Sequence, residues 1–222
     1  ANTTGASNVA VGSSALQSNT TASHNTAVGF QAGLSNTTGA DMVALGKGAL
    51  KLSTVGNGNT AVGNNALTSS TTPSNNTALG DNAGAANTTG SNNTIIGKQA
   101  LQANTTASHN TAVGYQSLFA NTTGADSNAF GAFALDANTT GGDNNAFGRS
   151  ALGANTTGSL NTAMGHGAVD ANTTGNHNTG FGANVLNDST TGSANTAAGY
   201  RALFSNTTAS NNNAFGFQAL YS

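Results

Sequence analysis

Small apolar, large apolar and polar residues recur in this chain in the same order every 17 residues. The period is marked by a glycine that returns without insertion or deletion, and the residue before it is apolar in every unit. These thirteen glycines, which we expect to form a structural ladder, are Gly12, Gly29, Gly46, Gly63, Gly80, Gly97, Gly114, Gly131, Gly148, Gly165, Gly182, Gly199 and Gly216. The consensus unit reads N-T-A-V-G-x-x-A-L-x-A-N-T-T-G-S-x. Such self-similarity is typical of proteins whose units stack on one another.

Each unit contains two short apolar segments and one turn. The segment T-A-V-G predicts a strand, and x-A-L-x predicts a second one. The segment N-T-T-G-S-x predicts a turn, because Asn and Gly suit left-handed backbone and side-chain caps. A helical hairpin is disfavoured, because the unit has no Glu and no apolar spacing of 3.6 residues.

One unit cannot bury its own apolar face, so we expect equivalent strands of successive units to pair about 4.8 Å apart. The sequence therefore predicts an all-β fold, a parallel β-solenoid of thirteen 17-residue coils. Residues 1–222 form a single uninterrupted array in this prediction, uncapped at both ends. The array is then either a segment of a longer fibre or a unit that stacks end to end into a filament.

Neighbouring residues of a strand point to opposite sides, so the Ala and the large apolar residue before each glycine face opposite ways. The Ala side suits a narrow coil interior. The side that carries Val, Leu and Phe needs a partner, and other copies of the chain are the simplest one. The sequence therefore predicts self-association.

Composition removes several classes of protein. Leu, Ile, Val and Phe together make only 35 of the 222 residues, which is too little for a conventional core of this length. Five Lys and Arg cannot build the basic face that a nucleic-acid partner requires. No apolar run reaches membrane-spanning length, and the absence of Cys excludes disulfides and thiolate metal sites.

The segment N-T-A-V-G at 25–29, 59–63 and 110–114 resembles the YadA-like head repeats of trimeric autotransporter adhesins. It is equally similar to the N-T-A-V-G-Y-Q-A-L arrays of bacteriophage tail fibres and bacterial surface fibres, since residues 110–116 read N-T-A-V-G-Y-Q. The resemblance implies a homotrimeric, left-handed β-roll on an extracellular, cell-surface or virion fibre, with a host-surface or glycan receptor as partner. The 17-residue unit is longer than the usual head repeat, because it contains an added N-T-T-G turn.

No residue set predicts catalysis, a metal site or a cofactor. His24, His109 and His177 share one position of the unit but lie five and four coils apart, too far for one metal ion. No carboxylate pair recurs with a base or nucleophile in a fixed relation, so the sequence predicts a protein that is not an enzyme. The aspartates are interpreted as solvated surface charge; those in shared columns are Asp41, Asp126, Asp143, Asp136 and Asp170.

Threonine stands eight positions after the glycine in every unit, from Thr3 to Thr207. We interpret this ladder as structural, with hydroxyl groups that satisfy turn backbone; the alternative is a flat array that binds ice or a polysaccharide. The preceding Asn serves turn geometry or, formally, accepts an N-linked glycan. The candidate glycosylation sites are Asn2, Asn19, Asn36, Asn87, Asn104, Asn121, Asn138, Asn155, Asn172 and Asn206.

Aromatic residues follow the repeat glycine in only a few units. Phe30, Tyr115 and Tyr200 are spaced by 85 residues, and residues 22–41 match 107–126 well beyond the consensus, which indicates duplication of a five-coil block. These aromatics either pack among themselves or contact a receptor or glycan.

Taken together, these patterns predict a non-enzymatic structural and adhesive fibre segment without cofactors. The alternative is a ligand-binding solenoid, for ice or carbohydrate, that uses the Thr and Asn ladders.

Overall fold

The computed structural model describes residues 2–221 and contains thirteen strands of three residues each, one per repeat, with no helix in that range. The strands are β1 (Val9–Val11), β2 (Thr26–Val28), β3 (Val43–Leu45), β4 (Thr60–Val62), β5 (Thr77–Leu79), β6 (Thr94–Ile96), β7 (Thr111–Val113), β8 (Asn128–Phe130), β9 (Asn145–Phe147), β10 (Thr162–Met164), β11 (Thr179–Phe181), β12 (Thr196–Ala198) and β13 (Asn213–Phe215). All pairs are parallel, so the predicted all-β parallel solenoid is confirmed.

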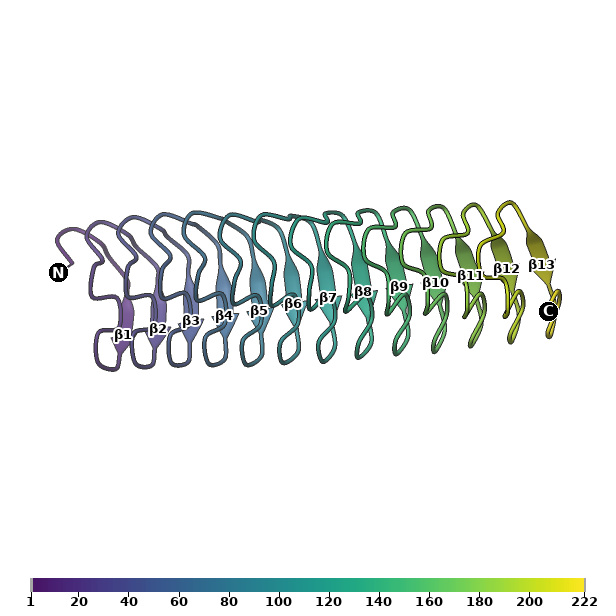
Figure 1. Ribbon diagram of the computed structural model, residues 1–222. Helices are drawn as coiled ribbons and strands as arrows, with labels where there is room; N and C mark the ends of the chain where they lie inside the picture. Colours follow the sequence, from purple (N-terminus) through teal and green to yellow (C-terminus); the bar gives the residue numbers. More distant parts are fainter. Residues whose placement is uncertain (1, 222) are drawn as a thin grey trace. The chain divides into compact units, whose positions relative to one another are not determined.

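The chain divides into two compact units, Ala1–Asn110 with β1 to β6 and Thr111–Ser222 with β7 to β13. Within each unit every strand pairs with its equivalent one repeat away, without a shift in register (Figure 1). Ala27 faces Ala44 in the first unit, and Ala129 faces Ala146 in the second. The 17-residue period therefore sets the register directly.

The interior of each coil is narrow and lined by small residues. The middle residue of β2 to β13 is buried, and it is Ala in all of these strands except β6 and β11. The Ala and Leu that follow the repeat glycine, such as Ala66 and Leu67, are also 0% exposed. This confirms that the Ala side of the strand faces inward.

The predicted second strand is wrong. The segment x-A-L-x forms consecutive turns, in which the Leu adopts a left-handed backbone; φ is 50° at Leu67 and 50° at Leu118. In a strand the adjacent Ala and Leu would point to opposite sides, but here both are buried. The left-handed residue turns the Leu inward beside the Ala, and this contributes more large apolar surface to the interior than a strand could.

The repeat glycines stand directly after the strands, with φ between 123° at Gly12 and 143° at Gly80. At Gly131 a Cβ atom would also lie 2.6 Å from the carbonyl oxygen of Gly148 in the next coil. Both the backbone conformation and the close approach of neighbouring coils therefore require glycine at this corner.

Departures from the consensus compensate one another inside the coil. Gly84 replaces the buried Leu of its unit, and the side chain of Ile95, which replaces Ala, fills the space, with Cδ1 2.7 Å from where a Gly84 Cβ would lie. Met42 lies against Gly33 in the same way. In both places a larger side chain occupies the space left by the missing Leu, so the interior stays packed although the residue that fills it changes.

Candidate functional surface

Two columns of asparagine run through the coil interior. The turn asparagines are those of the N-T-T motif, and the strand asparagines are those four positions before the repeat glycine. Nδ2 of the turn asparagine Asn155 and Nδ2 of the strand asparagine Asn144 donate to the same acceptor, the Gly158 carbonyl, at 2.9 and 2.7 Å. Asn36 and Asn25 share the Gly39 carbonyl in the first unit. In coils that have both asparagines, the two side chains therefore hold the polar turn from inside.

The turn asparagines also bond to one another. Nδ2 of Asn155 donates to Oδ1 of Asn138 at 2.8 Å, and Nδ2 of Asn172 donates to Oδ1 of Asn155 at 2.8 Å. Such amide ladders satisfy polar groups that would otherwise be costly to bury. The column of turn asparagines is evident in the sequence. Its position inside the coil follows only from the path of the chain.

Burial changes the interpretation of the candidate glycosylation sites. Eight of the ten Asn side chains are 0 or 1% exposed: Asn19, Asn36, Asn87, Asn104, Asn121, Asn138, Asn155 and Asn172. An N-linked glycan occupies the Nδ2 atom, which here is enclosed and donates hydrogen bonds, so a glycan at these eight positions is incompatible with the folded coil. Asn2 is exposed and Asn206 is partly exposed.

The invariant threonines form the expected structural ladder. Oγ1 of Thr139 donates to the Thr156 carbonyl at 2.9 Å, and Oγ1 of Thr37 donates to the Thr54 carbonyl at 3.0 Å. These hydroxyl donors and the buried asparagine amides are used within the protein. The second Thr of each motif is different, because Thr140 and Thr157 are exposed to solvent.

The outer face of the strands carries the unpartnered apolar stripe that the sequence predicted. The last residue of each strand is exposed or partly exposed in all thirteen coils. In the first unit Leu79 is 49% exposed, and in the second unit Phe147 is 36% exposed and stacks on Phe130 with ring centroids 4.9 Å apart. Single exposed apolar residues are ordinary, but a contiguous row of them marks an interaction surface.

The histidines stay on the surface. Nδ1 of His24 lies 3.6 Å from Oδ1 of Asp41, and both side chains are about two-thirds exposed, at 66% and 68%. His109 and His177 are exposed at the same position of their own coils. Among residues 2–221, no group of three potential His, Asp or Glu ligands is placed to hold a metal ion.

Two aspartates depart from the expected solvated charge. Asp136 and Asp170 are partly buried and stand two coils apart in one column, with Gly153 between them. Asp170 Oδ1 lies 2.5 Å and Asp136 Oδ1 3.5 Å from the point where a Gly153 Cβ would be. Burial raises the pKa of both carboxyls above the ordinary 3.8, and the Asp170 charge adds to the rise at Asp136.

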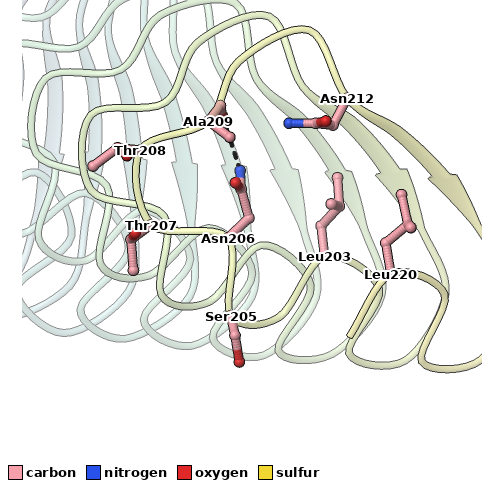
Figure 2. Close-up of a pocket in the computed structure, with 8 residues that line it drawn as sticks. All are labelled: Leu203, Ser205, Asn206, Thr207, Thr208, Ala209, Asn212 and Leu220. Atoms are coloured by element: carbon pink, nitrogen blue, oxygen red, sulfur yellow. Dashed lines mark hydrogen bonds between the residues drawn. The ribbon is translucent and has the colours of Figure 1, made fainter. Parts of the chain in front are cut away.

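A pocket in the second unit lies at the last coil (Figure 2). It is lined by Leu203, Ser205, Asn206, Thr207, Thr208, Ala209, Asn212 and Leu220. Nδ2 of Asn206 donates to the Ala209 carbonyl at 3.0 Å, as turn asparagines do in other coils. The equivalents of Asn206 and Asn212 one or two coils earlier, such as Asn172 and Asn195, are buried. The pocket is therefore lined by residues whose equivalents in earlier coils form the buried interior.

Comparison with known proteins gives no matching family model, no matching curated protein and no matching solved structure. No helix within residues 2–221 has the length and apolar character to cross a membrane.

Proposed function

We propose that this chain is a structural and adhesive segment of an extracellular fibre, without enzymatic activity, which associates as a homotrimer. The observation that carries the proposal is the apolar stripe on the outer face of the strands. Within the second unit it includes Phe130, Phe147, Met164 and Phe181, each between 36 and 44% exposed. Covering this row removes apolar surface from water, and the hydrophobic effect favours that association.

A second copy of the chain fits the stripe because the stripe repeats with the coil. Parallel strands set about 4.8 Å apart give two copies the same periodicity, so their side chains can interdigitate along the stripe of a unit. Three copies about a common axis bury one stripe from each chain, and closed rotational symmetry leaves no stripe uncovered. The left-handed coil and the location on a cell surface or virion rest on the resemblance to adhesin and tail-fibre repeats.

The polar columns on the remaining outer surface suit a protein that presents the same groups many times. The exposed second threonines and the variable column that contains His24 and Asp41 repeat once per coil. Repeated weak contacts with a receptor add through multivalency, which is the physical basis of adhesion by a fibre.

The alternative is a solenoid that binds ice or carbohydrate through its Thr and Asn ladders. Internal hydrogen bonds reduce the number of ladder side chains that are free to bind such a ligand. The turn asparagines and the invariant threonines donate to groups of neighbouring coils, so of these ladders only the exposed second threonine remains for a ligand. A single threonine column is a weaker candidate surface than the apolar stripe.

Light scattering of the purified chain at micromolar concentration tests the proposal. We expect a mass three times the 21.5 kDa of one chain. A monomer at this concentration would refute the trimer, and electron microscopy of the same sample shows whether trimers also join end to end.

A further inference from the structure

Five side chains of the second unit form an aromatic and cationic cluster. They lie in the segments that follow the repeat glycines Gly199 and Gly216 of two neighbouring coils. The Tyr200 and Phe217 rings stack with centroids 5.6 Å apart and an interplanar angle of 21°. The Phe204 and Tyr221 rings stack with centroids 5.3 Å apart at 15°. The guanidinium carbon of Arg201 lies 5.2 Å from the Tyr200 centroid and 5.2 Å from the Phe204 centroid. Two ring stacks therefore flank one positive charge.

The Arg201 guanidinium lies against two aromatic rings and keeps unused hydrogen-bonding capacity. Its Nε atom is buried without a hydrogen-bond acceptor, while the side chain as a whole remains partly exposed. No carboxylate within residues 2–221 forms an ion pair with it. The aromatic faces stabilise the cation, yet the guanidinium keeps N–H donors that suit a planar carboxylate.

The cluster is open to solvent because of its position in the repeat. Tyr200 directly follows a repeat glycine and is 41% exposed; Tyr115, at the same position five coils earlier, is 42% exposed. The side chains at this position therefore face solvent in different coils of the unit. The surroundings of the two tyrosines differ, because Gln116 stands where Arg201 does and Tyr115 meets Phe133 edge-on at 89°. The Tyr200 cluster is thus a distinct surface within an otherwise repetitive unit.

We propose that Tyr200, Arg201 and Phe204 bind a sugar residue that carries a carboxylate. The exposed parts of the Tyr200 and Phe204 rings contact the apolar C–H groups of a pyranose ring, and the guanidinium donates two hydrogen bonds to the carboxylate. Inorganic phosphate would use the cation alone, whereas an acidic sugar uses both features of the cluster. This site does not depend on the trimer or on the fibre function.

Titration calorimetry of the intact chain tests the site with two acidic probes, an oligogalacturonate and N-acetylneuraminate, and with the neutral methyl ester of each. We expect binding of at least one acid and about tenfold or greater weakening for its ester, since a charge-assisted hydrogen bond is lost. The two acids distinguish a uronic-acid ligand from a sialic-acid ligand.

Arg201→Gln is the matched variant, because Gln116 occupies the same position with φ 55°, against 54° for Arg201. We expect the variant to lose acid binding about tenfold or more while its thermal unfolding and its mass by light scattering stay unchanged. Arg201→Lys keeps the charge but not the planar donor pair and should bind more weakly than the unmodified chain. Equal affinity for acid and ester, unchanged binding by Arg201→Gln, or no binding of either acid at millimolar concentration overturns the proposal.

Discussion

Asn172 and Ser189 occupy consecutive places in the turn-asparagine column of the second unit, and Asn172 Oδ1 and Ser189 Oγ are both buried without a hydrogen-bond partner. In the preceding coils Asn155 Oδ1 accepts from Asn172 Nδ2 at 2.8 Å. The serine at 189 is too short to continue this ladder. The break leaves two polar atoms in the interior that lost water on folding and gained no hydrogen bond there.

Ser189→Asn should therefore stabilise the chain. The new Nδ2 can donate to Asn172 Oδ1 and to the Gly192 carbonyl, as equivalent asparagines do in other coils. Satisfying a buried polar group contributes about 1–3 kcal/mol, so we expect a rise of about that size in the free energy of unfolding in urea. Asn155→Ser is the matched control, which introduces the same break elsewhere and should lower stability by a similar amount. Unchanged stability in both variants would show that the ladder contributes nothing net.

The apolar stripe gives a prediction about assembly. Phe147→Ser removes a stacked ring from the stripe of the second unit, and we expect it to weaken the proposed trimer by at least tenfold in dissociation constant. Sedimentation at several concentrations measures the shift. Leu160→Asn is the control. Leu160 is 50% exposed, but it stands at the position that His24 and Asp41 occupy in their own coils, outside the stripe. If both variants weaken assembly equally, the stripe is not the interface.

The sequence predicted the parts of the fold that depend on periodicity. The repeated glycine gives the period of 17 and hence the in-register strands, and alternation within T-A-V-G gives the inward Ala and the outward apolar residue. The second strand could not be predicted correctly, because an adjacent Ala-Leu pair has no alternation and its left-handed Leu is uncommon for a side chain with a Cβ. The sequence singled out Tyr200 but not its cluster. Arg201 meets Tyr200 and Phe204 through the turn of its own coil, and the ring stacks with Phe217 and Tyr221 form only when the next coil is added.

The partly buried aspartates predict a dependence of stability on pH. Burial raises the pKa of Asp136 and Asp170 in the folded chain, so folding favours their protonated forms. Proton binding to the two carboxyls therefore stabilises the folded chain. This stabilisation is fully present below about the ordinary pKa of 3.8 and is lost as pH rises through the raised folded pKa. Asp136→Asn should therefore unfold at a higher temperature than the unmodified chain at pH 7, with no difference at pH 3.

Thermal unfolding followed by circular dichroism at both pH values measures this effect. The control is Asp143→Asn, which removes an equal charge from an exposed position in the same unit. If the unfolding temperature of Asp136→Asn is raised equally at pH 7 and pH 3, Asn is favourable at position 136 for reasons other than charge. A gain of equal size in the control would attribute the effect to net charge rather than to burial.

The volume exchange between Gly84 and Ile95 predicts strong coupling between two positions eleven residues apart. Ile95→Ala alone leaves a cavity where Ile95 Cδ1 now lies beside Gly84, and it should cost about 2–5 kcal/mol. Gly84→Leu alone places a Cβ 2.7 Å from that atom and 2.9 Å from Leu67 Cδ2, so overpacking should cost about 1–3 kcal/mol. The backbone accepts the leucine, because φ is 59° at Gly84 and 50° at Leu67.

The double variant restores the consensus Ala and Leu, so its stability should return to within about 1 kcal/mol of the unmodified chain. Urea unfolding of all four proteins closes the double-mutant cycle and gives the coupling energy. Additive losses would mean that the coil interior relaxes independently around each position. Strong coupling would instead show that the two positions share one packed space, which explains why Gly84 and Ile95 depart from the consensus together.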